Sequence, residues 1–187
     1  GGAATGSRTP NWADAEYAAL QDGFTLDATF RLDAIAGGYV DVFGGMQSGG
    51  IGLEAVGTSA TTYELQFWYA SPRPAVSLKY GQWYHVTAWY DGQDARLYVD
   101  GVRKAESEGV SFSVKPSAAD ARYMVIGGDA NTSGALDDAT MDGRIAGVEV
   151  YSAPLSDKDV YRVATRELTA LDTMPPLVRV APEPAGE

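Results

Sequence analysis

The sequence contains no cysteine and a single histidine, His85. The absence of cysteine excludes a disulfide framework, a thiolate nucleophile and any metal site with cysteine ligands. One histidine likewise excludes a metal site built from several imidazoles. A Ser–His–Asp triad through His85 stays open, although the Gly-x-Ser-x-Gly turn that would support it is absent from the sequence.

Basic residues are scarce in this chain. There are 14 lysines and arginines against 25 aspartates and glutamates, which gives a formal net charge of -11. Nucleic acid is not an expected partner, because affinity for it comes mainly from basic side chains that neutralise phosphates. The same charge disfavours an anionic membrane surface. An acidic domain suits neutral ligands such as sugars, cations or basic partners, and the acidity can equally serve solubility alone.

Long hydrophobic runs are also absent. No run approaches the roughly 18 apolar residues of a membrane-spanning helix, and the first residues lack the pattern of a signal peptide, so membrane insertion is not expected. The chain is long enough for one domain that buries about 70% of the surface its unfolded form exposes. We expect residues 1–12 to be a cloning scar or linker, residues 13–171 to form the domain, and residues 172–187 to be a proline-rich linker to another domain of a longer protein.

Most of the sequence consists of short segments in which apolar and polar residues alternate between turn-forming residues. Such period-two alternation is typical of β-strands with one buried face. About ten to twelve strands with almost no helix predict an all-β fold, a two-sheet antiparallel sandwich or jelly roll. Strands are expected at 23–33, 39–46, 50–57, 62–70, 83–90, 96–99, 122–128 and 143–151, with a short further strand after the turn at Asp100–Gly101.

One helix is predicted after the strands. Ser156 with Asp159 three residues later resembles a capping box, with aspartate in place of the usual glutamate. A short helical turn is also predicted around residues 13–20. Apolar residues of the C-terminal helix recur near helical spacing, at Val160, Val163, Ala164, Leu168 and Leu171.

The segment WYHVTAWY, residues 83–90, holds four aromatic residues, including two of the four tryptophans of the chain, and its only histidine. Period two divides it into a face with Trp83, His85, Thr87 and Trp89 and a face with Tyr84, Val86, Ala88 and Tyr90. The second face has the character of a core face. The partner strand carries large residues on both sides, so we expect this hairpin to be covered on both faces, with His85 as a hydrogen-bonded packing residue.

The segment GQWYHVTAWYDGQDARLYVDG, residues 81–101, resembles the central hairpin of laminin G-like domains, which belong to the concanavalin A-like jelly-roll superfamily. Three other segments resemble the same family in the same order: GFTLDATFRL its early strand, MVIGGDA its late strand, and MDGRIAGVEVYSAPLSDKDV its closing strand and helix entry. The resemblance covers about residues 15–165 and implies the fold, a concanavalin A-like jelly roll with a C-terminal helix. It implies no single function, because this fold hosts lectins, sugar-binding modules, adhesion domains and some glycosidases.

Catalysis has little support in the sequence. A retaining glycosidase of this superfamily carries carboxylates that alternate along one strand, with two of them about 5 Å apart. Glu54, Glu64 and Glu149 instead stand singly on their predicted strands. We therefore expect no enzymatic activity, and the alternative is a glycosidase or other hydrolase of the superfamily.

The segment 127–143 predicts a calcium site. Asp129, Asn131 and Ser133 alternate as the first ligands of a calcium loop do, but the twelfth position is Thr140 rather than glutamate, so other oxygen ligands are needed. The resemblance adds weight, because laminin G-like domains often hold calcium at a loop rim. The alternative is that these residues only form a turn. The predicted metal ligands are Asp129, Asn131, Asp137, Asp138 and Asp142.

A carbohydrate site is predicted on the strand at 62–70. Glu64, Gln66 and Trp68 share one face of this strand, opposite the apolar face. The apolar face of a pyranose stacks on indole while neighbouring polar groups bind its hydroxyls. The alternative is that Trp68 is packed under a loop or the helix, since tryptophan is highly buried on average.

Together these features predict a non-catalytic module, extracellular or at the cell surface, that binds carbohydrate or a protein partner, with calcium as structural support.

Overall fold

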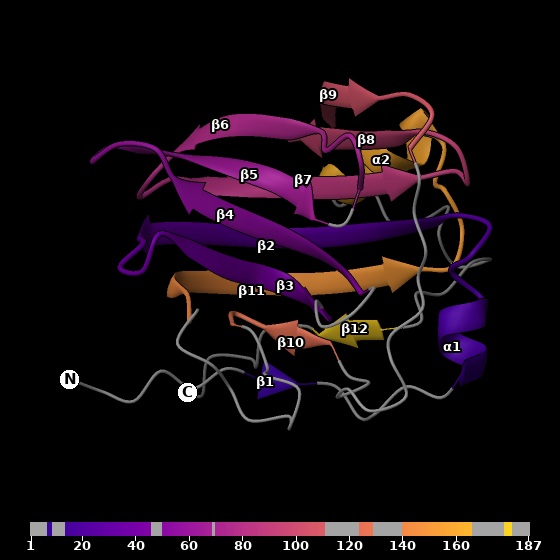
Figure 1. Ribbon diagram of the computed structural model, residues 1–187, viewed down its shortest axis with the longest axis horizontal. Helices are drawn as coiled ribbons and strands as arrows, with labels where there is room; N and C mark the ends of the chain where they lie inside the picture. Colours follow the sequence, from indigo (N-terminus) through magenta and orange to yellow (C-terminus); the bar gives the residue numbers. More distant parts are fainter. Residues whose placement is uncertain are drawn as a thin grey trace.

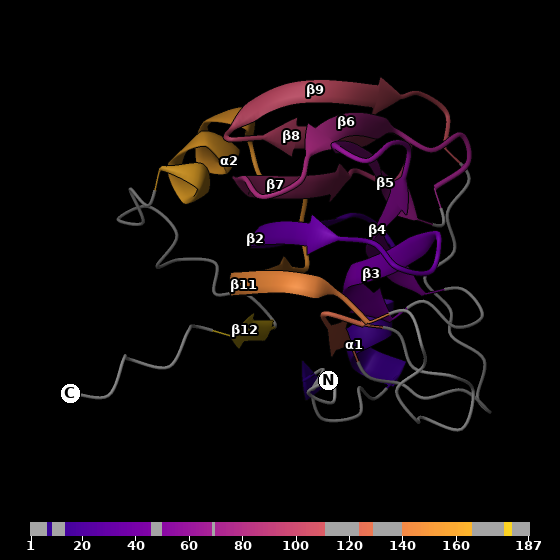
Figure 2. The same ribbon diagram turned by 90° about the vertical axis from the view of Figure 1, so that its left-hand side faces the viewer.

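The computed structural model describes residues 7–8, 14–45, 50–68, 70–110, 124–128, 140–165 and 178–180. Two six-stranded antiparallel sheets pack face to face, as Figures 1 and 2 show, so the predicted sandwich is confirmed. Sheet A has the strand order β1 (Ser7–Arg8), β10 (Val125–Ile126), β3 (Tyr39–Gly45), β4 (Ile51–Gly57), β5 (Thr62–Trp68) and β6 (Ala75–Lys79). Sheet B has the order β12 (Val178–Val180), β11 (Asp142–Tyr151), β2 (Phe24–Ala34), β7 (Trp83–Tyr90), β8 (Ala95–Val99) and β9 (Val102–Ser107).

The core lies between the inner faces of the two sheets, and period-two alternation decides which residues enter it. On β5 the residues Tyr63, Leu65 and Phe67 are fully buried, and the intervening residues are partly exposed. The Phe24 ring of sheet B meets the Phe67 ring of sheet A edge to face, with centroids 5.7 Å apart. Strands predicted from alternation are therefore positioned by one shared apolar layer.

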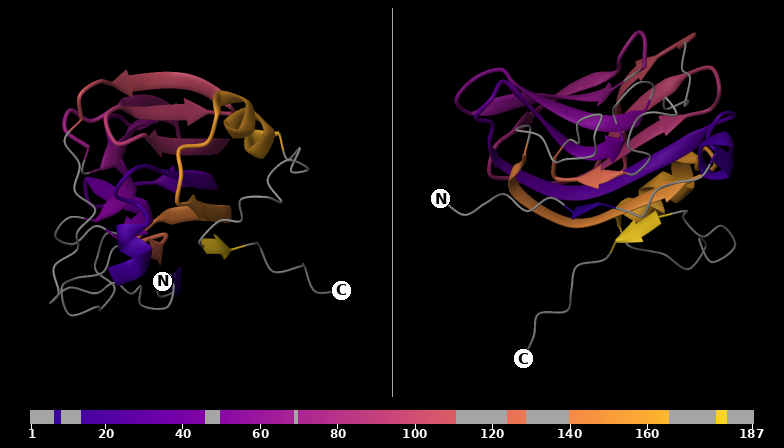
Figure 3. Two further views of the ribbon diagram at one scale, coloured as in Figure 1. Left: turned by 90° about the vertical axis from the view of Figure 1, so that its right-hand side faces the viewer. Right: turned by 60° about the horizontal axis from the view of Figure 1, so that its bottom comes forward.

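Helix α2 (Asp157–Ala164) covers part of the outer face of sheet B, as Figures 2 and 3 show. The Ser156 hydroxyl accepts a hydrogen bond from the backbone N–H of Asp159, which confirms the predicted N-cap. The indole N–H of Trp89 donates to the carbonyl of Leu155 at 2.8 Å. A second apolar cluster forms beneath the helix, from Trp89, Tyr98, Tyr151, Leu155, Val160 and Val163. Leu168 and Leu171 lie outside the described residues.

The stretch WYHVTAWY is β7, and its two faces differ in their surroundings. Val86, Ala88 and Tyr90 belong to the main core, and Trp89 is covered by α2. Trp83, however, is 46% exposed. The expectation that both faces of this strand are covered is therefore correct at the Trp89 end and wrong at the Trp83 end, because α2 extends over only one end of the strand.

Several short elements escape prediction from alternation. Strand β6 follows two prolines, Pro72 and Pro74, in a stretch where no strand is predicted. Strands β1 and β12 lie in the segments expected to be linkers, where they pair with β10 and β11.

Helix α1 (Asp14–Ala18) matches the helical turn predicted around residues 13–20. Among the described residues, no helix is long and apolar enough to cross a lipid bilayer.

A buried aspartate joins two strands on the outer face of sheet B. Asp27 on β2 is 4% exposed. It accepts hydrogen bonds from Nε2 of His85 and from the hydroxyl of Thr87, both on β7 and both at 2.8 Å. Burial of the imidazole opposes its charge, but the hydrogen bond to Asp27 and the negative charges of Asp27, Asp100 and Glu149 outweigh that effect, so the pKa of His85 lies above its ordinary value of 6.5.

The turn between β8 and β9 packs against α2. Asp100 and Gly101 both have positive φ, 52° and 74°, as the predicted Asp-Gly hairpin requires. A Cβ atom at Gly101 would lie 3.1 Å from a ring carbon of Tyr161 and 3.2 Å from Cβ of Ala164. Glycine is thus required at this position by backbone conformation and by contact with the helix.

We expect Gly101→Ala to lower the free energy of unfolding by about 2–3 kcal/mol, because left-handed strain and the contact with α2 add together. The matched control is Gly109→Ala, where φ is 61° and nothing lies within 4 Å of the added Cβ. In this control the free energy of unfolding should fall by only about 1 kcal/mol, which is the cost of the backbone conformation alone. Urea unfolding of the three proteins measures both values, and equal losses would show that α2 does not constrain the turn.

We expect the single imidazole to titrate above 6.5 in an NMR pH titration of the folded protein, and Asp27→Asn to lower that pKa. Because folding raises the pKa, the charged His85–Asp27 pair contributes its full stabilisation below about pH 6.5 and loses it as pH rises through the folded-state pKa. Wild type should therefore be more stable than His85→Gln at low pH, with a difference that narrows as pH rises.

Urea unfolding of wild type and His85→Gln across pH 5.5 to 8.5 measures this difference, where the range brackets the ordinary histidine pKa of about 6.5. A difference that widens with pH, or an imidazole that titrates below its ordinary pKa in the wild type, would contradict the assignment of a charged pair.

Candidate functional site

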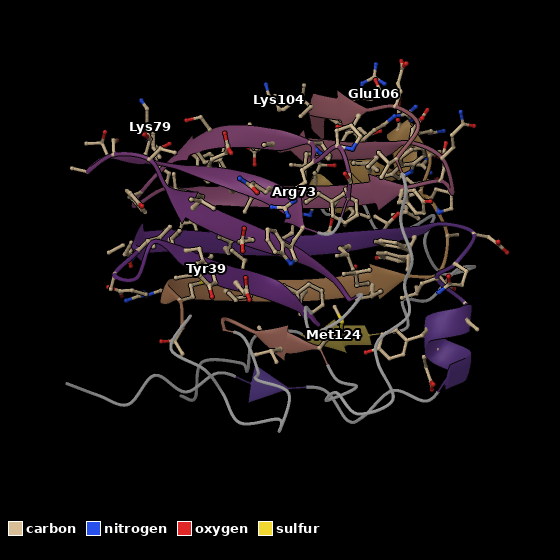
Figure 4. All side chains as sticks on the ribbon, in the orientation of Figure 1. Tyr39, Arg73, Lys79, Lys104, Glu106 and Met124 are labelled. Atoms are coloured by element: carbon tan, nitrogen blue, oxygen red, sulfur yellow. The ribbon has the colours of Figure 1, made fainter. Side chains whose placement is uncertain are left out.

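The outer face of sheet A carries the three residues predicted to bind carbohydrate. Glu64, Gln66 and Trp68 alternate along β5 and are all partly exposed, while the residues between them are buried in the core. Figure 4 looks onto this face, with Tyr39 on β3 and Arg73 in the loop before β6 labelled on it. Because one strand carries the predicted trio, alternation alone suffices to bring its members together.

Arg73 joins this trio and was not predicted. Its guanidinium carbon lies 3.6 Å from the centroid of the Trp68 ring, and its Nη1 donates to Oε1 of Gln66 at 3.3 Å. The amide nitrogen of Gln66 donates to Oε1 of Glu64 at 2.7 Å. This chain of contacts fixes which way the Gln66 amide points and holds the Arg73 side chain over the indole. We call Glu64, Gln66, Trp68 and Arg73 the Trp68 patch.

Two further carboxylates lie on the same sheet face. Asp41 on β3 is opposite Glu54 on β4, and Glu54 is opposite Gln66 on β5. Side chains at directly opposite positions have Cβ atoms about 4.5–5.5 Å apart, so the two acids are neighbours across strands. The two acids come from different strands, so alternation along a single strand does not predict this pair.

The position of this pair argues against hydrolysis at this point of the face. Asp41 is 2% exposed and Glu54 is 7% exposed. A glycosidase needs its nucleophile and its general acid in contact with the substrate. Side chains so nearly closed to solvent offer no such contact.

One of the five predicted calcium ligands, Asp142, lies in the described part of the chain. Asp129, Asn131, Asp137 and Asp138 lie outside the described residues, and Asp142 is the exposed first residue of β11. Across the residues whose placement is described, no group of three or more His, Cys, Asp or Glu side chains gathers in a way that could hold a metal ion. Calcium binding by this segment therefore stays a prediction.

The ends of this acidic segment are nevertheless anchored. The backbone N–H of Met141 donates to the carbonyl of Gly127 at 3.0 Å, and the N–H of Gly127 donates to the carbonyl of Val42 at 2.9 Å. Val42 follows Asp41 in β3, so the segment begins and ends beside the strand that carries Asp41. Gly127 and Met141 are thus held next to β3 by backbone hydrogen bonds.

The His85 cluster does not have the order of a catalytic triad. In such a triad the hydroxyl donates to the imidazole, which is oriented by the carboxylate. Here the Thr87 hydroxyl donates directly to Asp27, and Nδ1 of His85 has no hydrogen-bond partner in the described part of the chain. The interpretation of His85 as a hydrogen-bonded packing residue is consistent with this geometry.

Comparison with solved structures gives matches of the same fold. A heptameric SAP-like pentraxin from Limulus polyphemus is 19% identical, with a TM-score of 0.63 over 87% of this chain and 81% of that chain. Domain 4 of an extracellular arabinanase from Geobacillus stearothermophilus, solved with arabinotriose, is 17% identical, with a TM-score of 0.58 over 85% of this chain and 72% of that one. A putative carbohydrate-binding protein from Bacteroides ovatus is 17% identical, with a TM-score of 0.54 over 76% of this chain and 40% of that one. At these identities the likeness shows the fold alone.

Comparison with curated proteins finds no match. A family model does match, over residues 4–161, and it describes laminin G domains of the concanavalin A-like lectin/glucanases superfamily. The match covers most of the chain and agrees with the two-sheet architecture. The protein therefore belongs to the laminin G-like domains of the concanavalin A-like lectin/glucanases superfamily.

Proposed function

We propose that this domain is a non-catalytic module that binds carbohydrate on the outer face of sheet A. The Trp68 patch is the observation that carries the proposal. It combines an aromatic ring with an amide and a carboxylate on one partly exposed surface, and the Arg73 guanidinium lies over the ring. Sugar recognition needs a ring beside polar groups, because the ring accepts the apolar face of a pyranose and the polar groups bind its hydroxyls.

Charge and fold both agree with this proposal. A formal net charge of -11 favours a neutral glycan over an acidic one. Of the similar structures, the Geobacillus domain was solved with arabinotriose and the Bacteroides protein is described as carbohydrate-binding. The Geobacillus domain is one domain of an extracellular arabinanase, and the match covers only 40% of the Bacteroides chain. These two similarities support a domain that is attached to others and acts outside the cell or at its surface.

We expect the wild-type domain to bind neutral glycans on an array, and Trp68→Ala to weaken that binding by about tenfold or more, since loss of one stacking ring costs on the order of 1.4 kcal/mol. The matched control is Trp83→Ala, which removes a 46% exposed tryptophan from sheet B. Isothermal titration with the best glycan gives the dissociation constants.

Other outcomes of this experiment have distinct meanings. Equal losses in both tryptophan variants would show that the Trp68 patch is not the binding site. Capture of a protein partner with no glycan bound would favour the protein-binding alternative. Release of reducing sugar from an arabinan or β-glucan panel would favour the hydrolase alternative and contradict a non-catalytic module.

We also propose calcium as a structural cofactor of the segment 127–143. Adding calcium should raise the melting temperature, because a cation that binds only the folded state stabilises it by mass action. Asp129→Ala should abolish the increase, whereas Asp22→Ala, an exposed aspartate in the turn before β2, should retain it. Differential scanning fluorimetry with calcium and with a chelator measures this, and equal melting temperatures in the two conditions would exclude the site.

A further inference from the structure

The Trp68 indole is covered by the guanidinium of Arg73. Arg73 is an exposed residue, and its guanidinium carbon lies over the ring, 3.6 Å from the centroid, which is within cation–π contact. Figure 4 shows Arg73 on the open side of the sheet, over β4 and β5. A pyranose that stacks on the solvent side of this indole needs the surface that Arg73 occupies.

The surrounding charges do not favour Arg73 as a receptor for an acidic ligand. Asp41, Glu54 and Glu64 lie on the same sheet face as Arg73, and Lys79 is on this face too, opposite Thr62 at the other end of β5. A ligand carboxylate that approached Arg73 would meet this negative field and the net charge of the whole chain. The guanidinium is better explained by its internal partners, the indole and the Gln66 amide.

We propose that Arg73 is a displaceable cover of Trp68 and thereby sets the selectivity of the site. This inference rests on the proposed function. A neutral sugar with a sufficiently apolar face displaces the guanidinium and stacks on the indole, and a smaller or more polar ligand does not. The Arg73 side chain is held over the indole by one cation–π contact at an exposed position and one hydrogen bond to a neutral amide. Together these two contacts correspond to a ratio of roughly ten to one between molecules with a covered and with an uncovered indole.

The first experiment tests the cover without any ligand. Acrylamide quenching of tryptophan fluorescence is compared between wild type and Arg73→Ala, and each is repeated in the Trp68→Phe background so that the difference isolates Trp68. We expect Trp68 to be quenched more efficiently, by about twofold, when Arg73 is removed, because the cover is closed most of the time. Unchanged quenching would overturn the inference.

The second experiment tests the effect on binding. Titration with arabinotriose, and with the best neutral glycan from the array, should give an affinity about three- to tenfold higher for Arg73→Ala than for wild type. The matched control is Arg103→Ala, which removes the same charge from β9 of sheet B, where Arg103 pairs with Glu106, and should leave the affinity unchanged.

The outcomes separate this inference from the proposed function. A lower affinity in Arg73→Ala would show that Arg73 contacts the ligand, and an unchanged affinity would show that the ligand does not use the covered face. Either result overturns the inference while glycan binding itself stands. If no glycan binds to either protein, the proposed function is wrong, and the quenching result alone decides whether Arg73 covers Trp68.

Discussion

The packing of the two inner sheet faces against each other is the contact on which the rest of the structure depends. Phe24 of β2 meets Phe67 of β5 across this layer, and both rings are fully buried. Side chains of a strand alternate between its two faces. When the residues of one face pack into this layer, the residues between them therefore point away from the core along the whole strand. The outward positions are then free to differ in chemistry from one sheet to the other.

The two outer faces have different roles. On sheet B, α2 covers the Trp89 end of β7, and Asp27 binds His85 and Thr87 on the same face. Much of that surface is therefore occupied by contacts within the protein. On sheet A the strand β5 leaves polar and aromatic side chains partly open to solvent. The division explains why the dense aromatic stretch WYHVTAWY is mainly a structural element, and why the candidate site lies on the opposite sheet.

Features of the fold that depend on residues close together in the sequence were predictable, and features that depend on distant residues were not. Alternation within β5 was enough to place Glu64, Gln66 and Trp68 on one face, and the Asp-Gly turn and the Ser156 cap are equally local signals. Arg73 was missed because it comes from a proline-containing loop whose path alternation does not describe. The pairing of Asp41 with Glu54 depends on strand register, which shifts between Asp41 and Phe43. The contact of Asp27 with Thr87 spans 60 residues, and no local pattern encodes it.

The same separation of faces limits what fold similarity can say about ligands. A core of this kind requires apolar side chains of suitable size at alternate positions, and many sequences satisfy that requirement. Structures only 17–19% identical to this chain therefore share its architecture. Ligand choice depends instead on a few outward residues that contribute little to the core, and these are free to change without loss of the fold. For this chain the candidate site is correspondingly local: an indole, the guanidinium that lies on it, and the amide that accepts a hydrogen bond from that guanidinium and donates one to the Glu64 carboxylate.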